Sequence, residues 1–256
     1  MMTRLLVLFL LGMFQVTVVS ADLPDTVIAV KKSIVGVGTI HPTRTPRVKL
    51  RGTGFAIGDG SYIVTNAHVV DHALDEDRNE AYAVFSGRGT KYKVFPVKRV
   101  AIDFKHDLAI LRTLRSDLPG MVLGNSGSVR EGQQVAFTGF PIGSVLGLFP
   151  ATHRGIVSSI TPIVTPASNS SQLDVRQIKR LGDPYDVFQL DATAYPGNSG
   201  SPLYRPQNGR VIGVLNMVFV KESKENVLSK PSGISYAIPV NYVNELYKQA
   251  VSNPMK

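Results

Sequence analysis

Three polar residues that could together activate a hydroxyl group lie at the ends of short apolar segments. Ser199 stands in a glycine-rich turn, residues 196–202 (PGNSGSP), with apolar sequence on both sides. A serine hydroxyl is a weak nucleophile unless a base removes its proton and a third group orients that base. His68 follows the apolar run at 62–64, and Asp107 comes directly before the run at 108–111. Because His, Asp and Ser occur in this order in one known catalytic triad, we predict that Ser199 attacks, His68 takes and returns its proton, and Asp107 holds the imidazole.

The same turn could stabilise the negative charge that such an attack creates. We predict an oxyanion hole at Gly197, Asn198 and Ser199, in which the amides of Gly197 and Ser199 point at one position. The chemistry would be acyl transfer through an ester of Ser199. The residue after Gly200 is Ser201, so the last glycine of a Gly-x-Ser-x-Gly nucleophile elbow is missing and an α/β-hydrolase is disfavoured.

The elements that must position these residues are short strands. Glycine (23 residues) and proline (16) are frequent among 256 residues, as turn-rich β proteins require. Apolar runs at 54–57 and 62–65 flank the sequence GDGS, which predicts a hairpin. Further strands are expected at 33–40, 83–85, 91–100, 108–111, 134–139, 152–160, 188–190, 201–204, 211–220 and 234–238. The pattern breaks around 114–120, where we place an internal boundary, and a long polar insertion follows Ile160.

Helical spacing is expected at the end of the chain alone. After Pro239, apolar residues recur every three or four positions through Ala250. The start of the chain instead has the features of a targeting signal. Residues 1–21 combine a basic start, an apolar run at 5–19 and small residues at the end, and we predict a cleaved signal peptide. The run is short of the roughly 20 residues that span a bilayer, so we expect no stable membrane span.

The charge pattern limits the kinds of partner to expect, and the cysteine content limits the cellular compartment. The net charge is +9, but Lys and Arg are scattered, which favours a solvated basic surface and no nucleic acid partner. The chain has no cysteine, which in an exported protein of this size favours a bacterial periplasm or secreted fraction. The histidines outside the predicted triad show no metal-ligand spacing, so we expect no metal and no cofactor. His106, which abuts Asp107, could tune access to the site.

Local sequence around these residues resembles the HtrA/Do branch of the trypsin-like serine proteases. The matching segments, in register over nearly the whole chain after the leader, are 52–55 (GTGF), 64–70 (VTNAHVV), 107–111 (DLAIL) and 196–202, with support at 139–143 (GFPIG), 154–159 and 237–239. The resemblance implies a chymotrypsin-like, all-β fold of two perpendicular six-stranded β-barrels with a C-terminal helix. The protease domain would span 22–256, with barrels at about 26–115 and 120–240 and the helix at about 240–251. It also implies His68, Asp107 and Ser199 as the catalytic residues, protein or peptide substrates, and an active site in the cleft between the barrels.

Departures from the family pattern give further expectations. HtrA proteins typically continue into PDZ domains, whereas this sequence stops just after the expected helix, so we expect no PDZ-controlled capture. Classical zymogens carry an aspartate directly before the serine that pairs with a new N-terminal amine. The residue here is Asn198, so we expect activity that does not depend on an exact N-terminus.

The family pattern also points to a primary specificity pocket. Its base would be Thr193 and its wall Leu215, Asn216, Met217 and Val218. None of these is acidic, as Arg or Lys substrates require, and none is the histidine of glutamyl endopeptidases, which share the GNSGSP sequence. We therefore expect cleavage after uncharged residues.

A different class of function stays open beside the protease. The triad could be present but latent, in a protease-fold module that binds proteins or acts as a chaperone. The geometry of the loops at 141–150 and 161–186 would discriminate between the two. A homo-oligomer is also left open.

Overall fold

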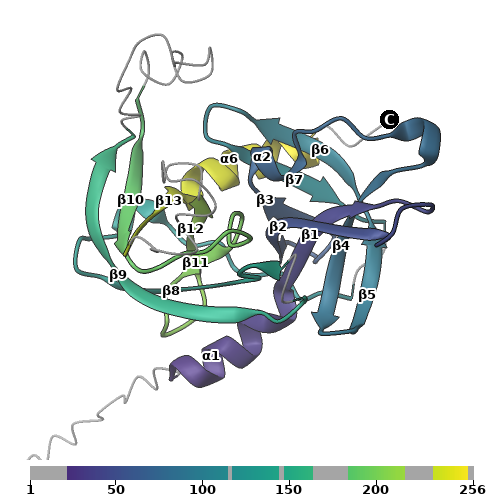
Figure 1. The fold of residues 1–256 in the computed structure, drawn as a ribbon. Coiled ribbons are helices and arrows are strands. Elements are labelled where there is room, and N and C mark those ends of the chain that lie inside the picture. Colours follow the sequence, from purple (N-terminus) through teal and green to yellow (C-terminus); the bar gives the residue numbers. More distant parts are fainter. Residues whose placement is uncertain (1–21, 115–116, 144–146, 164–183, 217–232, 253–256) are drawn as a thin grey trace, which may run out of the picture.

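The fold is built from two strand assemblies and two longer helices (Figure 1). A computed structural model describes residues 22–114, 117–143, 147–163, 184–216 and 233–252. The predicted signal peptide and most of the insertion at 161–186 therefore lie outside the described residues. The expected fold class is confirmed: the described chain is mostly strand, with a closed six-stranded barrel, a second sheet and a C-terminal helix.

The first half forms a curled sheet with the strand order β5-β4-β1-β2-β3-β7-β6. Its members are β1 (Ile34–Ile40), β2 (Val48–Ile57), β3 (Tyr62–Thr65), β4 (Ala81–Arg88), β5 (Lys91–Pro96), β6 (Lys98–Asp103) and β7 (Leu108–Arg112). The hairpin expected around GDGS is β2–β3, with Phe55 paired to Val64.

The first sheet has seven strands rather than six because the single strand expected at 91–100 is divided at Val97. The side chain of Val97 is buried, and its amide donates to the carbonyl of Tyr82 at 3.1 Å. β5, before this residue, pairs with β4, whereas β6, after it, pairs with β7. The two outermost strands are thus consecutive pieces of one bent strand, which makes the sheet curl back on itself.

The second half forms the closed barrel, with the order β10-β13-β12-β11-β8-β9. Its strands are β8 (Gln134–Gly139), β9 (Ala151–Pro162), β10 (Asp186–Asp191), β11 (Pro202–Tyr204), β12 (Val211–Asn216) and β13 (Ile234–Pro239). β12 is buried along its whole length, as expected for a strand covered on both faces. The sequence had placed its end at Val220, but residues beyond Asn216 lie outside the described part.

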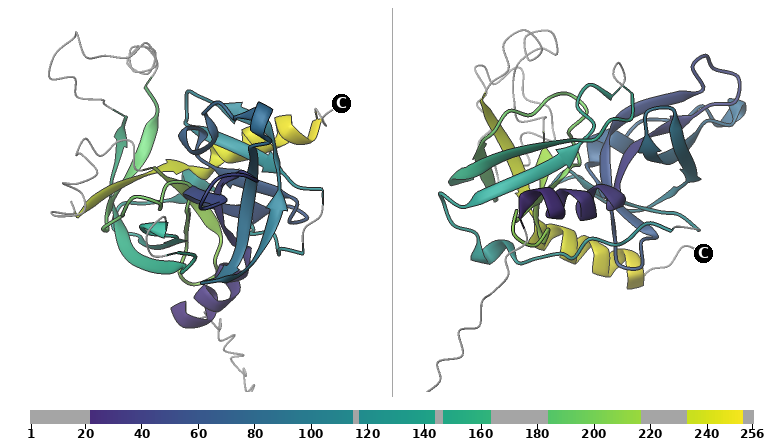
Figure 2. Two further views of the ribbon diagram at one scale, coloured as in Figure 1. Left: turned by 45° about the vertical axis from the view of Figure 1, so that its right-hand side comes forward. Right: turned by 90° about the horizontal axis from the view of Figure 1, so that it is seen from below.

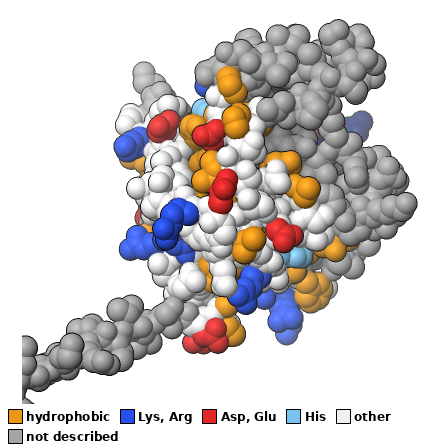
Figure 3. Space-filling view, turned by 90° about the vertical axis from the view of Figure 1, so that its left-hand side faces the viewer, with side chains coloured by type: hydrophobic (Ala, Val, Ile, Leu, Met, Phe, Trp, Pro, Cys, Tyr) orange, Lys and Arg blue, Asp and Glu red, His pale blue; other side chains and the backbone are white. Residues whose placement is uncertain are grey.

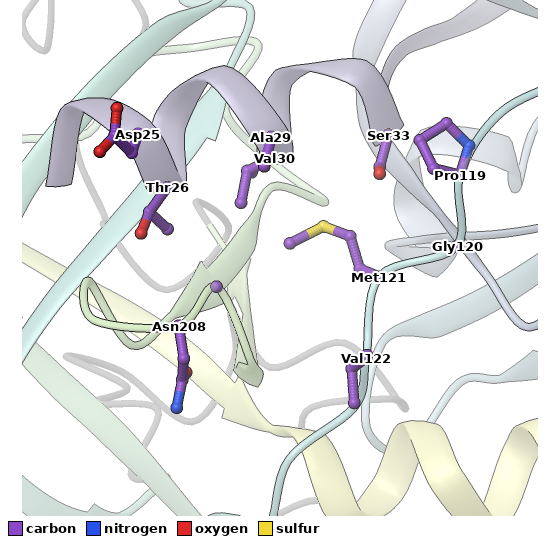
Figure 4. Close-up of a pocket in the computed structure, with 11 residues that line it drawn as sticks. Asp25, Thr26, Ala29, Val30, Ser33, Pro119, Gly120, Met121, Val122 and Asn208 are labelled. Atoms are coloured by element: carbon purple, nitrogen blue, oxygen red, sulfur yellow. The ribbon is translucent and has the colours of Figure 1, made fainter. Parts of the chain in front are cut away.

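A helix near the start was not expected from the sequence. α1 (Leu23–Val30) precedes the first strand, in a part of the chain where helical spacing had not been expected. Asp22 caps it by accepting the amide of Leu23, and Pro24 fits the first turn. α1 lies beside the connection between the two halves, and a cavity of about 360 Å³ separates them (Figure 4). Thr26 and Val30 of α1 face Met121 of the connection across this cavity (Figure 4).

The C-terminal helix was expected and is α6 (Val240–Ser252). It buries Val243, Leu246 and Ala250 and packs against β6, β7 and β12, so it ties the second half back onto the first (Figure 2). None of the helices in the described segments is long and apolar enough to cross a membrane. The face shown in Figure 3 carries basic, acidic and apolar side chains, with several of the basic ones in its lower part.

Candidate active site

His68 and Asp107 meet at one end of the neighbouring strands β3 and β7 of the first sheet. The single-turn helix α2 (Ala67–Val70) follows β3 and buries Ala67, Val69 and Val70, which leaves the His68 side chain about one-third exposed. Asp107 precedes β7, the neighbour of β3. Its Oδ2 lies 2.6 Å from His68 Nδ1, and its Oδ1 accepts the His68 amide at 2.9 Å. The carboxylate of Asp107 therefore contacts His68 at two points, the backbone amide and the imidazole ring.

The carboxylate of Asp107 is buried and has a third donor. Asn216 Nδ2 donates to Oδ2 at 2.7 Å, across 109 residues of sequence, and its side chain is fully buried. The main chain of Asp107 is also fixed, because its carbonyl accepts from Ala67 N at 3.1 Å and Asn66 Nδ2 at 3.0 Å. Asp107 adopts φ = 53°, in the left-handed region, which aspartate tolerates better than most residues. Such a conformation persists only when surrounding contacts enforce it.

Ser199 stands in a loop that is hydrogen-bonded to β2 and lies close to α2, the helix that carries His68. Its carbonyl accepts the amide of Thr53 at 2.8 Å. A Cβ atom added to Gly52 would come within 3.0 Å of that carbonyl oxygen and 2.8 Å of Val69, the residue after His68. Only glycine leaves room for this approach between α2 and the serine loop. The hydrogen bonds of the described residues join His68 to Asp107 but do not include one from Ser199 to His68; in proteases this contact often tightens only when substrate binds.

The residues before Ser199 form a turn of defined type. The amide of Asn198 donates to the carbonyl of Tyr195 at 2.9 Å, Pro196 is the second residue, and Gly197 has φ = 99°. These are the features of a type II turn. The carbonyl of Pro196 accepts the amide of Ile142 at 2.6 Å, from a residue that is itself in the left-handed region (φ = 50°). Because a trans peptide is planar, the N–H of Gly197 must point away from Ile142.

Asn198 requires a correction. It had been included among the oxyanion-hole residues, but its amide is already used in the turn and its side chain is buried. The amides of Gly197 and Ser199 donate to no acceptor among the described residues, so they are the remaining candidates. The carbonyl of Gly197 accepts the hydroxyl of Thr53 at 2.7 Å, which fixes the next peptide of the turn as well.

The residues expected in the specificity pocket have different surroundings. Thr193 is half-buried, at the position predicted for the pocket base. Leu215 is fully buried in the core of the second barrel, so its side chain does not line an open pocket. Asn216 turns its side chain onto Asp107 instead of into a pocket. Met217 and Val218 lie outside the described residues.

Sequence reasoning missed three residues that shape the site: Thr53, Ile142 and the amide of Asn216. All three stand in segments that had been noted for other reasons. No local signal in those segments identifies their partners, because each partner comes from a different strand or loop.

Comparison with known proteins agrees with this geometry. Residues 52–214 match the family described as trypsin-like peptidase domain, so the chain belongs to that family. A Halomonas elongata protein named as a probable periplasmic serine endoprotease, DegP-like, is 34% identical over 77% of this chain and 34% of its own length. The mitochondrial serine protease HTRA2 of Drosophila willistoni is 32% identical over 82% of this chain and 41% of its own length. The resemblance to the HtrA branch is thereby confirmed.

Solved structures show the same fold. The HtrA-type protease AlgW with a tripeptide has a TM-score of 0.65 at 24% identity, over 91% of this chain and 64% of its own. The Rv3671c protease of M. tuberculosis in its active form has a TM-score of 0.62 at 22% identity, over 88% and 83%. The chain spans about a third of the length of the bacterial relative named above.

Proposed function

We propose that this chain is an exported serine endopeptidase that hydrolyses peptide bonds of protein substrates through an acyl-enzyme on Ser199. The observation that carries the proposal is the two-point contact of buried Asp107 with His68. A carboxylate that accepts a hydrogen bond from Nδ1–H leaves Nε2 as the basic nitrogen of the ring and stabilises the imidazolium that forms when Nε2 takes a proton.

The reaction would proceed in two halves. Ser199 Oγ attacks the carbonyl carbon of the substrate while His68 Nε2 takes its proton, and the amides of Gly197 and Ser199 donate to the resulting oxyanion. The intermediate collapses as His68 gives the proton to the departing amine, which leaves an ester on Ser199. Water then attacks this ester, again with His68 as base, and releases the carboxylic acid and the free serine.

The turn at 195–198 supports an active rather than a latent arrangement. If the central peptide of the turn were rotated, the carbonyl of Pro196 would replace the N–H of Gly197 on the side of the oxyanion hole. The hydrogen bond from Ile142 holds this carbonyl on the opposite side. A latent form in which this peptide is rotated would require that bond to break.

The finer parts of the proposal concern location and specificity. The sequence of residues 1–21 and the periplasmic naming of the bacterial relative support export. The uncharged Thr193 supports cleavage after uncharged residues. A peptide-library profile dominated by cleavage after Arg, Lys or Glu would contradict this specificity.

The experiment that tests the proposal is fluorophosphonate labelling of purified residues 22–256. This reagent reports an activated serine without knowledge of the substrate. We expect labelling of the wild type and its loss in both His68→Ala and Ser199→Ala. A folded wild type that does not react would refute the active protease and favour the latent module.

A further inference from the structure

A second aspartate–histidine pair lies in the loop that carries Asp107. Asp103, at the end of β6, accepts the amide of His106 at 3.1 Å through Oδ1, and its Oδ2 lies 2.5 Å from His106 Nδ1. Asp107 holds His68 in the same way, with one oxygen on the amide and the other on Nδ1. The two pairs are adjacent in sequence, because His106 is bonded directly to Asp107.

The ring of His106 is packed between aromatic side chains from the second half of the molecule. It stacks on Tyr242 of α6 with ring centroids 3.8 Å apart and an angle of 17°, and it meets Tyr185 edge-on at 4.6 Å. The side chain is 12% exposed. α6 runs beside β6 and β7, which the loop connects (Figure 1). His106 thus ties this loop to the C-terminal helix.

The charge of Asp103 is maintained at this position. Burial opposes ionisation, but the hydrogen bonds from the ring and amide of His106 outweigh it and lower the pKa of Asp103 below its usual value. The carboxylate therefore stays an acceptor for both N–H groups over the neutral range.

The conformation of Asp107 depends on its neighbour. Its φ of 53° is the rotation about its N–Cα bond, which sets the direction of its side chain relative to the peptide that joins it to His106. A positive φ is unfavourable for a non-glycine residue, so the backbone would rotate away from it unless contacts on both sides of the residue hold the neighbouring peptides in place. Ala67 and Asn66 fix the carbonyl of Asp107 on one side. On the other side, the pair of Asp103 and His106 fixes the peptide between Lys105 and His106 and the His106 ring, one residue before Asp107.

We propose that Asp103 and His106 form a positioning pair, anchored to α6 by Tyr242, that holds Asp107 in the orientation that His68 requires. The inference rests on the proposed function, since its consequence is the rate of turnover. His106 touches neither substrate nor reacting atoms in this account. It acts through Asp107, whose displacement by even about 1 Å can cost on the order of 100-fold in rate.

Two substitutions separate the hydrogen bond from the ring packing. His106→Phe keeps a ring against Tyr242 but loses the N–H toward Asp103, whereas His106→Asn keeps an N–H near the Nδ1 position but loses the ring. His41→Phe is the matched control, because His41 is also buried and uses Nδ1 to contact Thr43 in another loop. We expect kcat per titrated active site to fall about 10- to 100-fold in His106→Phe, with KM within about twofold, and to recover partly in His106→Asn. The control should stay at the wild-type value.

A second measurement does not depend on activity. In protein with 15N-labelled histidine, the Nδ1 proton of His68 can be followed by NMR through its hydrogen bond to Asp107. We expect this resonance to shift in His106→Phe and to stay in place in His41→Phe. If kcat per titrated site and the His68 resonance both match the wild type in a folded His106→Phe protein, the pair is only a turn-stabilising feature and the proposal is wrong. If the wild type does not react with fluorophosphonate, the proposed function fails, while the NMR comparison still decides whether the pair positions Asp107.

Discussion

Gly197→Ala tests whether the turn before Ser199 is the oxyanion hole. Gly197 has φ = 99°, which L-residues rarely adopt. A Cβ atom at this position would lie 2.3 Å from the carbonyl oxygen of Phe140 and 3.3 Å from the amide nitrogen of Ile142. Both are main-chain atoms that cannot swing aside, so the turn itself must change.

The size of the effect follows from how the turn can respond. Left-handed backbone costs an alanine about 1–2 kcal/mol, and the contact with Phe140 adds to this. Rotation of the central peptide relieves the strain but breaks the bond between Ile142 and Pro196 and turns the N–H of Gly197 away. Loss of one oxyanion donor typically lowers kcat about 100- to 1,000-fold. We therefore expect a loss in that range, with KM little changed.

The assay compares Gly197→Ala with Gly132→Ala. Gly132 also has a positive φ (79°), but an added Cβ there meets nothing within 4 Å. Both variants carry backbone strain, and only one crowds the proposed hole. kcat on an unfolded protein substrate and the rate of fluorophosphonate labelling should fall together in Gly197→Ala and hold in Gly132→Ala, with thermal unfolding as a check of folding. A kcat for folded Gly197→Ala within tenfold of the wild type would refute the assignment.

Three further outcomes are expected. Asn216→Leu removes a donor to the buried carboxylate of Asp107. Because a hydrogen bond to a charged group is worth about 1.5–3 kcal/mol, kcat in steady-state assays should fall roughly 10- to 150-fold. An unchanged kcat would show that the bond is only structural. The pKa of Glu80 is lowered from 4.5 to about 2, chiefly by the hydrogen bond from the hydroxyl of Thr39. The contribution of the Glu80 carboxylate to folding stability is therefore complete above pH 4.5 and is lost as the pH falls toward 2. The thermal unfolding temperature of Glu80→Gln should depend less on pH in this window than that of the wild type, and an identical acid profile would contradict the reasoning. Extension of the N-terminus by a few residues before position 22 should leave kcat unchanged, because the buried residue before the serine is the neutral Asn198, and a large loss of turnover would count against it.

The candidate site was only partly predictable from the sequence. His68, Asp107 and Ser199 could be chosen because each carries local sequence typical of its expected role. The contacts of Asp107 with His68 then followed from the pairing of β3 with β7. The donor from Asn216 could not be foreseen, because it crosses 109 residues and arises where β12 reaches the first sheet. The turn geometry likewise depends on Ile142, which no pattern in residues 195–198 reveals.

The fold was likewise predictable only where the signal in the sequence is local. Alternating apolar runs and the GDGS turn were enough to predict the β2–β3 hairpin, and helical spacing was enough for α6. α1 was missed although Asp22 and Pro24 are good start signals, because its β-branched residues, such as Val27 and Ile28, favour strands. The division of the long strand at Val97 was missed because a bend imposed by the closing of a sheet has no local signature.

The sequence by itself determined which side chains are present at strand ends and turns, and therefore the chemistry that they can perform. Its information is local: turn residues, strand periodicity and the residues next to the histidine and serine act over a few positions. The tertiary structure alone decided which peptide plane faces the serine loop and which amide satisfies the buried Asp107. Those outcomes depend on packing between segments remote in sequence, where a shift of about 1 Å separates a hydrogen bond from a simple contact.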